Sequence, residues 1–490
     1  MGTNSGFLGT FAPMQNRLII DGAAVPAASG QTFPTLNPAT GETLTEVARA
    51  GAEDVDRAVA AARAAMDKGA WASMDGAARG QLLWKLGERM LAETQALAEL
   101  ETRDSGKTIR DTSGGDVPGA ARCFQYFAGW ADKIQGDVNP VSGPFLNYTR
   151  REPVGVVGAI IPWNFPILMA AWKLGPALAA GNTVVLKPAE QTPLTAIRLG
   201  ELALEVGFPP GVVNVLPGFG EEAGAALVRH PGVNKIAFTG STEVGKLIQR
   251  EAAATLKRVT LELGGKSPNI VFADADLEQA VRGALTGIFY NQGQVCTAGS
   301  RLLLERSVHD AFLAKLLDGA SKMQPGDPLS PKSRMGPLVS QQQLERVLGY
   351  VAKGKAEGAR LEVGGERVGD KGYFVPPTVF TGVKNDMTIA REEIFGPVLS
   401  IIPFDDVAEA TRIANDTIYG LAAAVWTRDI GKAHAVAHAI QAGTVWINTY
   451  MNSQNASPFG GYKQSGVGRE LGSSFIEHYT ELKSVWVRMG

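Results

Sequence analysis

The sequence predicts an α/β protein built from more than one structural unit. At 490 residues the chain is too long for one ordinary hydrophobic core and suits roughly two to four units. From residue 153 onward, short apolar runs rich in β-branched residues alternate with helical stretches. This alternation is typical of right-handed βαβ units that build a parallel sheet.

Composition excludes several functional classes. Hydrophobic residues make up 45%, charged residues 20%, and the formal net charge is −2, so neither a nucleic acid nor a membrane surface is indicated as a partner. No apolar run approaches the roughly 18–20 residues that cross a bilayer. Met1–Phe11 lacks the basic and apolar regions of a secretory signal. With two cysteines there is no disulfide framework, and we expect a cytoplasmic location with Cys123 as a buried, inert thiol.

The first unit is expected to begin with an arm over the first 30 residues. Helical periodicity then covers 53–66 and 81–103. The predicted strands are Val154–Ile161, Thr183–Leu186, Val212–Leu216 and Lys235–Thr239, with helices near 167–180, 192–206 and 221–229. Because the strands and helices alternate, the strands are expected to lie parallel in one sheet.

A second α/β unit is expected after the turn Leu263–Lys266. It opens with a strand at Asn269–Phe272, a helix from Leu277 and a strand at Arg301–Glu305. The tail from Phe475 to Val487 alternates apolar and polar residues near its end, which predicts a late strand. A terminal strand needs a sheet to join, and another subunit is one source of it.

Polar segments follow three of the predicted strands, at the sheet edge where ligands bind in α/β folds. Asn164 follows the first strand, and Lys187 and Glu190 follow the second. A carboxylate there accepts hydrogen bonds from ribose hydroxyls and repels a 2′-phosphate. Gly240 and Gly245 frame the turn into the next helix, whose N-terminal N–H groups suit a dinucleotide's phosphates. Their spacing is not G-x-G-x-x-G, so a simple tight turn is the alternative.

Two further residues are candidates for chemistry. Glu262 lies between two leucines before a glycine turn, a setting that raises a carboxyl pKa and suits a general base. Cys296 follows the glycine- and amide-rich stretch 291–295, where backbone N–H groups can stabilise a thiolate or an oxyanion. The alternatives are a solvated glutamate and a buried thiol. His434 and His438 lie one helical turn apart in an alanine-rich stretch, and we predict no metal site.

Taken together, these segments resemble the aldehyde dehydrogenase superfamily. Six motifs occur in the family's order: Pro162–Pro166, Lys187–Glu190, Phe238–Gly245, Leu261–Lys266, Gly293–Cys296 and Glu393–Pro397. The likeness runs from about residue 17 to the end. It is greatest with the NAD-dependent, broad-specificity cytosolic and mitochondrial type, as Pro217–Gly220 and Ser457–Lys463 also indicate.

The resemblance implies an α/β fold with a Rossmann-like NAD-binding domain, an α/β catalytic domain and a β-arm for oligomerisation. The expected boundaries are 1–132 and 151–262 for the NAD-binding domain, 263–467 for the catalytic domain, and 133–150 and 477–490 for the arm. Members of this group are homodimers or homotetramers, so a homo-oligomer that binds a small aldehyde is implied.

The resemblance also implies residue roles. The Cys296 thiolate attacks the aldehyde, Asn164 and the Cys296 N–H form the oxyanion hole, and Glu262 activates the water. Lys173 and Glu470 match proposed proton-relay positions. Glu190 favours NAD over NADP, and Glu262 favours hydrolysis over thioester transfer to coenzyme A. The implied cofactor-binding residues are Ile160, Ile161, Pro162, Trp163, Lys187, Glu190, Gly220, Gly224, Phe238, Gly240, Ser241, Val244, Leu263, Gln343, Glu393 and Phe395.

The implied substrate tunnel is apolar and aromatic, with no Lys or Arg to pair with a carboxylated substrate. Its residues are Phe165, Met169, Trp172, Tyr290, Val295, Thr297 and Phe459. We therefore predict broad aliphatic or aromatic aldehydes as substrates. A betaine aldehyde or an aminoaldehyde is the alternative, because aromatic linings bind cations. Segment 450–455 leaves the tunnel mouth undefined, and it contains no acidic residue to favour a cation. A third alternative is a catalytically silent structural or binding protein.

Overall fold

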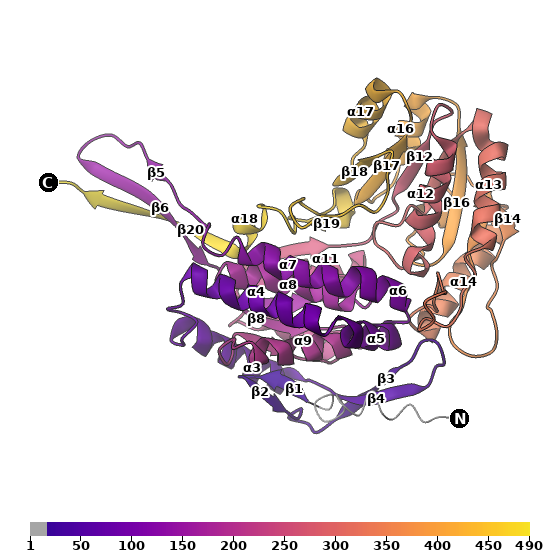
Figure 1. Ribbon diagram of the computed structural model, residues 1–490. Coiled ribbons are helices and arrows are strands. Elements are labelled where there is room, and N and C mark those ends of the chain that lie inside the picture. The colour runs from indigo at the N-terminus through magenta and orange to yellow at the C-terminus, as the bar shows by residue number, and fades with distance from the viewer. Residues whose placement is uncertain (1–16) are drawn as a thin grey trace.

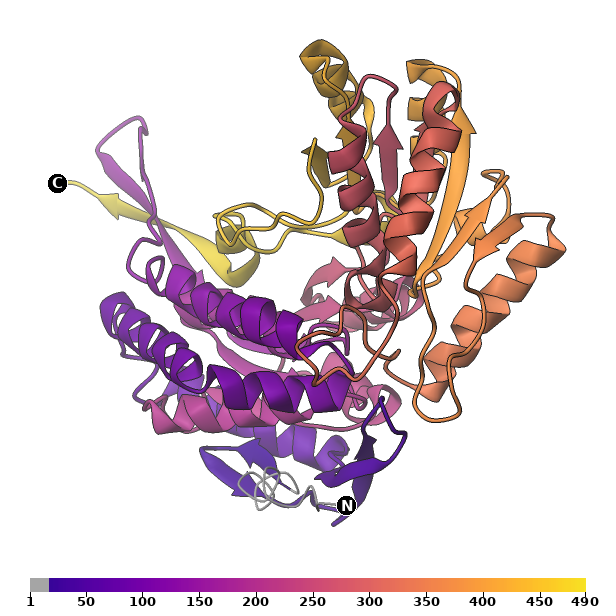
Figure 2. The same cartoon turned by 45° about the vertical axis from the view of Figure 1, so that its right-hand side comes forward.

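The computed structural model describes residues 17–490 (Figure 1). Residues 1–16, which include the segment Met1–Phe11 considered above, lie outside the described residues. Two sheets, each covered by helices, form two lobes, and a narrow three-stranded arm extends away from both (Figures 1 and 2). The fold is α/β, as the alternation of strands and helices predicted.

The first lobe is built on an eight-stranded sheet in the order β19-β11-β10-β7-β8-β9-β1-β2. Its strands are β1 (Leu18–Ile20), β2 (Ala23–Val25), β7 (Val156–Ile160), β8 (Thr183–Lys187), β9 (Val213–Val215), β10 (Lys235–Thr239), β11 (Arg258–Glu262) and β19 (Gly466–Val467). The five central strands are parallel. The chain order reverses between β7 and β10, and such a switch point leaves a crevice at the C-terminal strand ends where ligands bind.

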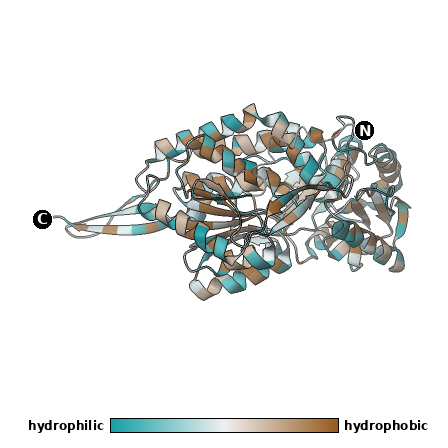
Figure 3. Cartoon of the chain, turned by 90° about the horizontal axis from the view of Figure 1, so that it is seen from below, coloured by the Kyte–Doolittle hydropathy of each residue, from teal (hydrophilic) through white to brown (hydrophobic). Residues whose placement is uncertain are grey.

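Helices cover both faces of the first sheet, and their apolar sides form its core. They are α3 (Ala52–Asp67), α4 (Gly76–Ala92), α5 (Thr94–Ser105), α6 (Ile109–Asp111), α7 (Val117–Ala128), α8 (Pro166–Ala179), α9 (Leu194–Glu205), α10 (Ala225–Arg229) and α11 (Thr242–Ala252). Two five-residue π-turns, η1 (Thr112–Asp116) and η2 (Gly220–Gly224), precede α7 and α10. The strands at the centre are mostly coloured as hydrophobic, whereas hydrophobic and hydrophilic residues alternate along the covering helices (Figure 3).

The second lobe is a seven-stranded sheet in the order β14-β15-β16-β13-β12-β17-β18. Its strands are β12 (Pro268–Val271), β13 (Arg301–Glu305), β14 (Arg360–Val363), β15 (Thr378–Thr381), β16 (Val398–Phe404), β17 (Ala422–Trp426) and β18 (Thr444–Ile447). Its helices are α12 (Leu277–Phe289), α13 (His309–Ser321), α14 (Gln341–Ala356), α15 (Thr388–Arg391), α16 (Val407–Asn415) and α17 (Ile430–Ala439). All pairings are parallel except that of β14 with β15.

The arm consists of β5 (Val138–Asn139), β6 (Phe145–Pro153) and the C-terminal strand β20 (Thr480–Arg488). β20 pairs antiparallel with β6 over its whole length, from Thr480 opposite Pro153 to Arg488 opposite Phe145. A separate hairpin, β3 (Thr32–Leu36) with β4 (Thr43–Ala48), lies beside the first lobe. Among residues 17–490, no helix combines the length and apolar character that crossing a membrane requires.

Two expectations about individual elements were wrong, and the late strand predicted in the tail was confirmed. The helix predicted over 81–103 is two helices, because Glu93 leaves the helical conformation and caps both α4 and α5. The described part of the first 30 residues is not an arm, since β1 and β2 join the first sheet through β9. The tail is helical at α18 (Phe475–Tyr479) before it becomes a strand, and that strand pairs within its own chain.

Candidate active site

A cavity of about 930 Å³ lies at the C-terminal strand ends of the first sheet, where segments of the second lobe face them. The predicted nucleophile, oxyanion donor and base, namely Cys296, Asn164 and Glu262, all line this one cavity, as does Glu470. Asn164 follows β7, Glu262 ends β11, and Cys296 lies between α12 and β13. Parallel strands bring their C-terminal ends to one edge, which is why residues far apart in sequence meet here.

Cys296 follows a strained turn, η4 (Tyr290–Gly293). Asn291 and Gln292 adopt left-handed φ values of 47° and 56°, a costly conformation for residues with a side chain. The Nδ2 atom of Asn291 holds the turn by donating to the carbonyls of Asn164 (3.0 Å) and Gln294 (3.2 Å). Cys296 itself is half-buried and free.

In the absence of a ligand, the electrostatic surroundings of Cys296 favour the neutral thiol over the thiolate. Burial, followed by the carboxyl groups of Glu393 and Glu262, raises the pKa of Cys296 to about 12. The backbone N–H groups of Thr297 and Cys296 act in the opposite direction. A cation close to the sulfur is therefore needed to favour the reactive form.

Asn164 lines the same cavity as the thiol, and its amide is held in place. Its Nδ2 atom donates to the carbonyl oxygen of Gln294 at 3.0 Å, and the residue is only 6% exposed. An amide carries two N–H bonds, so the second remains for a ligand. A fixed donor next to a nucleophile has the chemistry of an oxyanion hole.

Glu262 is a buried carboxylate whose two oxygens have no hydrogen-bond partner among residues 17–490. It is 3% exposed. Burial, together with the nearby Glu470 carboxylate, raises the pKa of Glu262 well above its ordinary value, while Lys173 and Arg469 oppose that rise. A carboxylate without hydrogen bonds at a cavity wall is well suited to accept a proton.

A buried ion pair lies behind Glu262. Lys173, on α8, pairs with Glu470, and its ammonium also donates to the hydroxyl of Thr239 at 2.5 Å. Lys173 and Glu470 are 0% and 2% exposed, and Lys173 does not line the cavity.

One end of the cavity has the residues that a dinucleotide needs. Eight of the predicted cofactor residues line it: Pro162, Trp163, Gly240, Ser241, Leu263, Gln343, Glu393 and Phe395. Ser241 caps α11 by accepting a hydrogen bond from the N–H of Val244 (3.2 Å), and the positive end of that helix suits a pyrophosphate. A Cβ on Gly245 would come within 2.9 Å of the Leu263 Cδ1 atom, so the helix packs closely against that loop.

Glu393 and Phe395 close this end of the cavity. The Glu393 carboxylate accepts a hydrogen bond from the N–H of Gly265 at 2.9 Å, and burial raises the pKa of Glu393 to about 7. The Phe395 ring meets Trp163 edge-on at 5.2 Å, and Gln343 donates to the Phe395 carbonyl at 2.7 Å. These contacts fix a carboxylate and an aromatic ring close to the thiol.

The other eight predicted cofactor residues lie outside the cavity wall, along the same sheet edge and in the turns that follow it. They are Ile160, Ile161, Lys187, Glu190, Gly220, Gly224, Phe238 and Val244. Lys187 pairs with Glu190 at 3.2 Å, and the Lys187 Cδ atom lies 3.7 Å from where a Cβ of Gly224 would sit. Burial lowers the pKa of Lys187, and Glu190 opposes this effect. These groups fit an adenosine ribose.

The other end of the cavity is aromatic. All seven predicted tunnel residues line it: Phe165, Met169, Trp172, Tyr290, Val295, Thr297 and Phe459. Trp172 meets Phe459 edge-on at 5.1 Å, and the rings of Phe165 and Tyr290 are 6.1 Å apart. The structure also defines the mouth that the sequence left open, since Met451, Ser453, Gln454 and Asn455 lie on the wall.

The predicted tunnel residues include no Lys or Arg, but among residues 17–490 the wall of the cavity as a whole includes two arginines. Arg122 on α7 reaches the cavity wall, together with Gly115, Asp116 and Gly119 from the η1–α7 segment, and Arg346 lines it as well. Sequence reasoning missed the η1–α7 wall because those residues interrupt a helical stretch and match no motif. The sequence Thr-Ser-Gly-Gly-Asp at 112–116, which forms the π-turn, was the available signal.

Outside the cavity, Cys123 is fully buried in the core of the first lobe, with its Sγ atom 3.6 Å from the Ala171 carbonyl. The rings of His434 and His438 are 6.0 Å apart on α17. Within the described part of the chain, no group of three or more His, Cys, Asp or Glu side chains is placed to hold a metal ion.

Comparison with known proteins identifies the family. The sequence model described as "Aldehyde dehydrogenase family" matches residues 25–485. Mitochondrial aldehyde dehydrogenase of Rattus norvegicus is 52% identical over 476 residues, covering 97% of this chain and 92% of the relative. Retinal dehydrogenase 2 of Homo sapiens is 53% identical over 464 residues, covering 94% and 89%.

A solved structure agrees over the whole chain. The NAD+ complex of aldehyde dehydrogenase from Bacillus cereus has a TM-score of 0.98 at 52% identity and covers 99% of both chains. The sequence identity and the shared fold therefore agree with the chemistry of the cavity. One end of the cavity suits a dinucleotide, and the other end suits a small organic molecule. This chain belongs to the aldehyde dehydrogenase family and is an enzyme that uses NAD.

Proposed function

We propose that the enzyme oxidises neutral aliphatic and aromatic aldehydes to carboxylic acids through a covalent intermediate on Cys296. The observation that carries the proposal is the cavity itself. Its wall holds a thiol, a fixed amide donor and an unpartnered carboxylate, between a dinucleotide end and an aromatic end. Each step of an oxidation followed by a hydrolysis has a side chain to perform it.

In the first half-reaction, the Cys296 thiolate forms a bond to the aldehyde carbon, and the carbonyl oxygen becomes an oxyanion. The free N–H of Asn164 and the backbone N–H of Cys296 stabilise that oxyanion. Bound NAD supplies a cationic nicotinamide that favours the thiolate and accepts the hydride. Loss of the hydride from the thiohemiacetal carbon leaves a thioester on Cys296.

In the second half-reaction, Glu262 takes a proton from water, and the resulting hydroxide attacks the thioester carbon. The carbon–sulfur bond breaks, the acid leaves, and Cys296 returns as the thiolate. The proton then passes from Glu262 towards Glu470 and Lys173, which lie behind it. The raised pKa of Glu262 suits this role, because it makes the carboxylate a stronger proton acceptor than an exposed glutamate.

The cofactor residues divide between the two ends of NAD. We assign Lys187 and Glu190 to the adenosine ribose, Ser241 and the N-terminus of α11 to the pyrophosphate, and Glu393 to the nicotinamide ribose. Phe395, against Trp163, borders the nicotinamide. The carboxylate of Glu190 also favours NAD over NADP, because it repels a 2′-phosphate.

We propose the domain division given by the resemblance: 1–132 with 151–262, 263–467, and an arm of 133–150 with 477–490. The two large sheets support it, although β19 at Gly466–Val467 joins the first sheet. The arm exposes Val138 (72%), Leu482 (55%) and Trp486 (59%), which fits docking onto a second copy in a homodimer or homotetramer. We place the enzyme in the cytoplasm, where both free thiols stay reduced.

A spectrophotometric panel tests the proposal. NADH formation at 340 nm is followed with short aliphatic, long aliphatic, aromatic and trimethylammonium aldehydes, and kcat/KM is compared across them. Neutral aldehydes are expected to be the better substrates. If no aldehyde yields NADH, the protein is a silent member of its family. If the trimethylammonium aldehyde is preferred, the betaine-aldehyde alternative is correct.

A further inference from the structure

A buried ammonium group lies behind the aromatic wall of the tunnel. The Nζ atom of Lys107 sits over the face of the Phe165 ring, 3.5 Å from its centroid, and 5.7 Å from the centroid of Tyr290. Both rings line the cavity, whereas Lys107 does not, and Lys107 is 1% exposed. The lysine therefore contacts the wall from the protein side, out of reach of the substrate.

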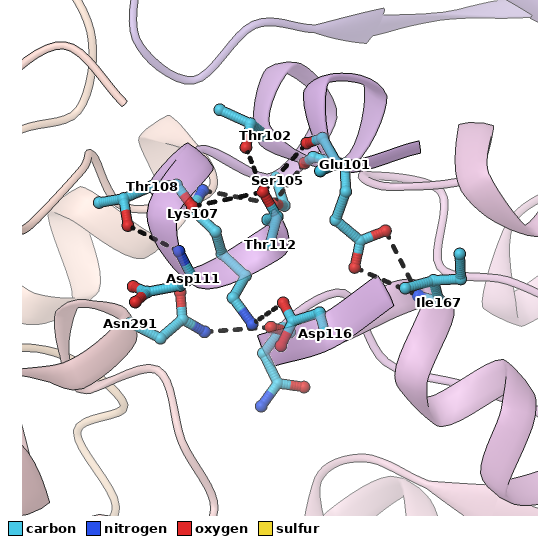
Figure 4. A network of polar contacts seen from close by, with 12 residues as sticks. Glu101, Thr102, Ser105, Lys107, Thr108, Asp111, Thr112, Asp116, Ile167 and Asn291 are labelled. Atoms are coloured by element: carbon cyan, nitrogen blue, oxygen red, sulfur yellow. Dashed lines mark hydrogen bonds and ion pairs between the residues drawn. The ribbon is translucent and has the colours of Figure 1, made fainter. Parts of the chain in front are cut away.

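Three acidic side chains surround this ammonium: Asp116 pairs with it, and the ammonium charge opposes the burial-driven rise in the pKa values of Asp111 and Glu101. Asp116, at the end of η1, forms an ion pair with Lys107, is 2% exposed and itself contributes to the cavity wall. Figure 4 shows the two side chains pointing toward each other, beside Asn291 from the turn that precedes Cys296. Two aromatic faces and a carboxylate are the groups that bind organic cations. Here the protein's own lysine occupies them.

Because Lys107 already interacts with these groups, this part of the tunnel wall should bind a second cation weakly. The Phe165 ring already interacts with the Lys107 ammonium, which weakens the attraction that its π-system can offer to a second cation. The negative charge of Asp116 is also compensated by the lysine, so it offers little attraction. A neutral aldehyde of the same shape meets neither effect.

We infer that Lys107 is a specificity-determining residue that biases the tunnel toward neutral aldehydes and against trimethylammonium or amino aldehydes. The inference rests on the proposed function, in which the aromatic end of the cavity receives the aldehyde. Lys107 acts through Phe165, Tyr290 and Asp116, so it is a positioning residue. It does not contact the substrate or the reacting atoms.

The test compares two aldehydes that share a shape and differ by one charge. Trimethylammonioacetaldehyde and 3,3-dimethylbutanal place a quaternary nitrogen and a quaternary carbon at the same position. The ratio of their kcat/KM values is measured for the wild type, Lys107→Met and Lys107→Arg. Because the ratio compares substrates within one variant, a general loss of stability or of active enzyme cancels out.

The wild type is expected to favour 3,3-dimethylbutanal. Lys107→Met frees the Phe165 face and removes the positive charge beside it, and should shift the ratio toward the cation by about tenfold. Lys107→Arg retains the charge and should stay within about twofold of the wild type. A ratio that does not move in Lys107→Met overturns the inference, as does a wild type that prefers the cation.

Two further variants keep the test decisive. Lys107→Met leaves Asp116 buried without its partner, which is destabilising. If it does not fold, the double variant Lys107→Met with Asp116→Asn replaces it, and a shift of about threefold toward the cation is expected from the freed ring face alone. Arg122→Gln removes one positive charge from the cavity wall without touching the ring. An equal shift in Arg122→Gln means that overall charge, and not Lys107, sets the preference.

The outcomes separate this inference from the proposed function. A folded wild type that oxidises neither aldehyde contradicts the proposed function. A wild type that oxidises 3,3-dimethylbutanal, with the same ratio in every Lys107 variant, contradicts only the role of Lys107.

Discussion

Substitution of Gly460 by alanine should slow release of the acid product by displacing the Glu262 carboxylate. A Cβ atom at position 460 would lie 2.7 Å from Glu262 Oε1, 2.8 Å from the Arg469 Cδ atom and 2.9 Å from the Gly468 carbonyl oxygen. Gly460 also has a φ of +152°, which residues with a side chain rarely adopt. Alanine can be accommodated only if its neighbours move.

The size of the effect follows from that overlap. Ordinary van der Waals contact begins near 3.4 Å, so Glu262 has to retreat by about 0.7 Å or the backbone has to shift. A misplacement on the order of 1 Å costs about 100-fold in rate when it affects a positioned catalytic group. We therefore expect a fall in kcat of about 100-fold, which corresponds to about 2.7 kcal/mol at the barrier of the hydrolytic step.

Stopped-flow fluorescence of NADH separates the two half-reactions. Gly460→Ala should give a burst of about one NADH per active site followed by slow turnover, because hydride transfer does not need Glu262. The matched control is Gly349→Ala inside α14, where an added Cβ meets nothing within 4 Å. It should keep full activity and gain up to about 1 kcal/mol in stability. Wild-type turnover in Gly460→Ala, or loss of its burst, would contradict the proposed displacement of Glu262.

Three further outcomes are expected. Burial raises the pKa of Glu101 to about 8, so the folded state holds the carboxyl proton more tightly than the unfolded chain does. The free energy of unfolding should therefore fall by up to about 5 kcal/mol as the pH rises from about 4.5 to 8. Glu101→Gln should therefore flatten the decline of Tm over that range, and an equally steep decline would contradict it. Glu190→Gln should raise kcat/KM with NADP relative to NAD by about tenfold, because the substitution removes a charge that repels the 2′-phosphate. An unchanged ratio would show that Glu190 does not select the cofactor. Trp486→Ser, on the exposed arm, should lower the particle mass seen by light scattering, and an unchanged mass would contradict arm-mediated assembly.

The parts of the site that follow strand ends could be predicted from the sequence. Parallel strands all deliver their C-terminal residues to one edge, so Asn164, Glu190 and Ser241 were expected at the same edge once a parallel sheet was inferred. The strand β11 that places Glu262 at this edge was not predicted. Cys296 could be ranked as a nucleophile only through the motifs around it, since a lone cysteine is most often a buried apolar residue. Cys123 is such a residue.

The wall contributed by the η1–α7 segment could not be predicted in the same way. Asp116 and Arg122 reach the cavity wall, and Lys107 pairs with Asp116 away from that wall. These positions depend on how the helices pack, and helix packing depends on contacts that no local pattern encodes. The end of α4 and the start of α5 at Glu93 could not be predicted for a related reason. The apolar face continues from α4 into α5, while the chain direction changes at a single residue.

The covalent role of Cys296 is tested most directly by mass spectrometry of the Glu262→Gln enzyme, quenched during reaction with an aldehyde and NAD. Without the base, the thioester should accumulate, so the peptide that contains Cys296 should carry the acyl group after one burst of NADH. Cys296→Ser should give neither the burst nor the adduct. If Glu262→Gln turns over at the wild-type rate, or if the acyl group is found on another residue, the mechanism is contradicted.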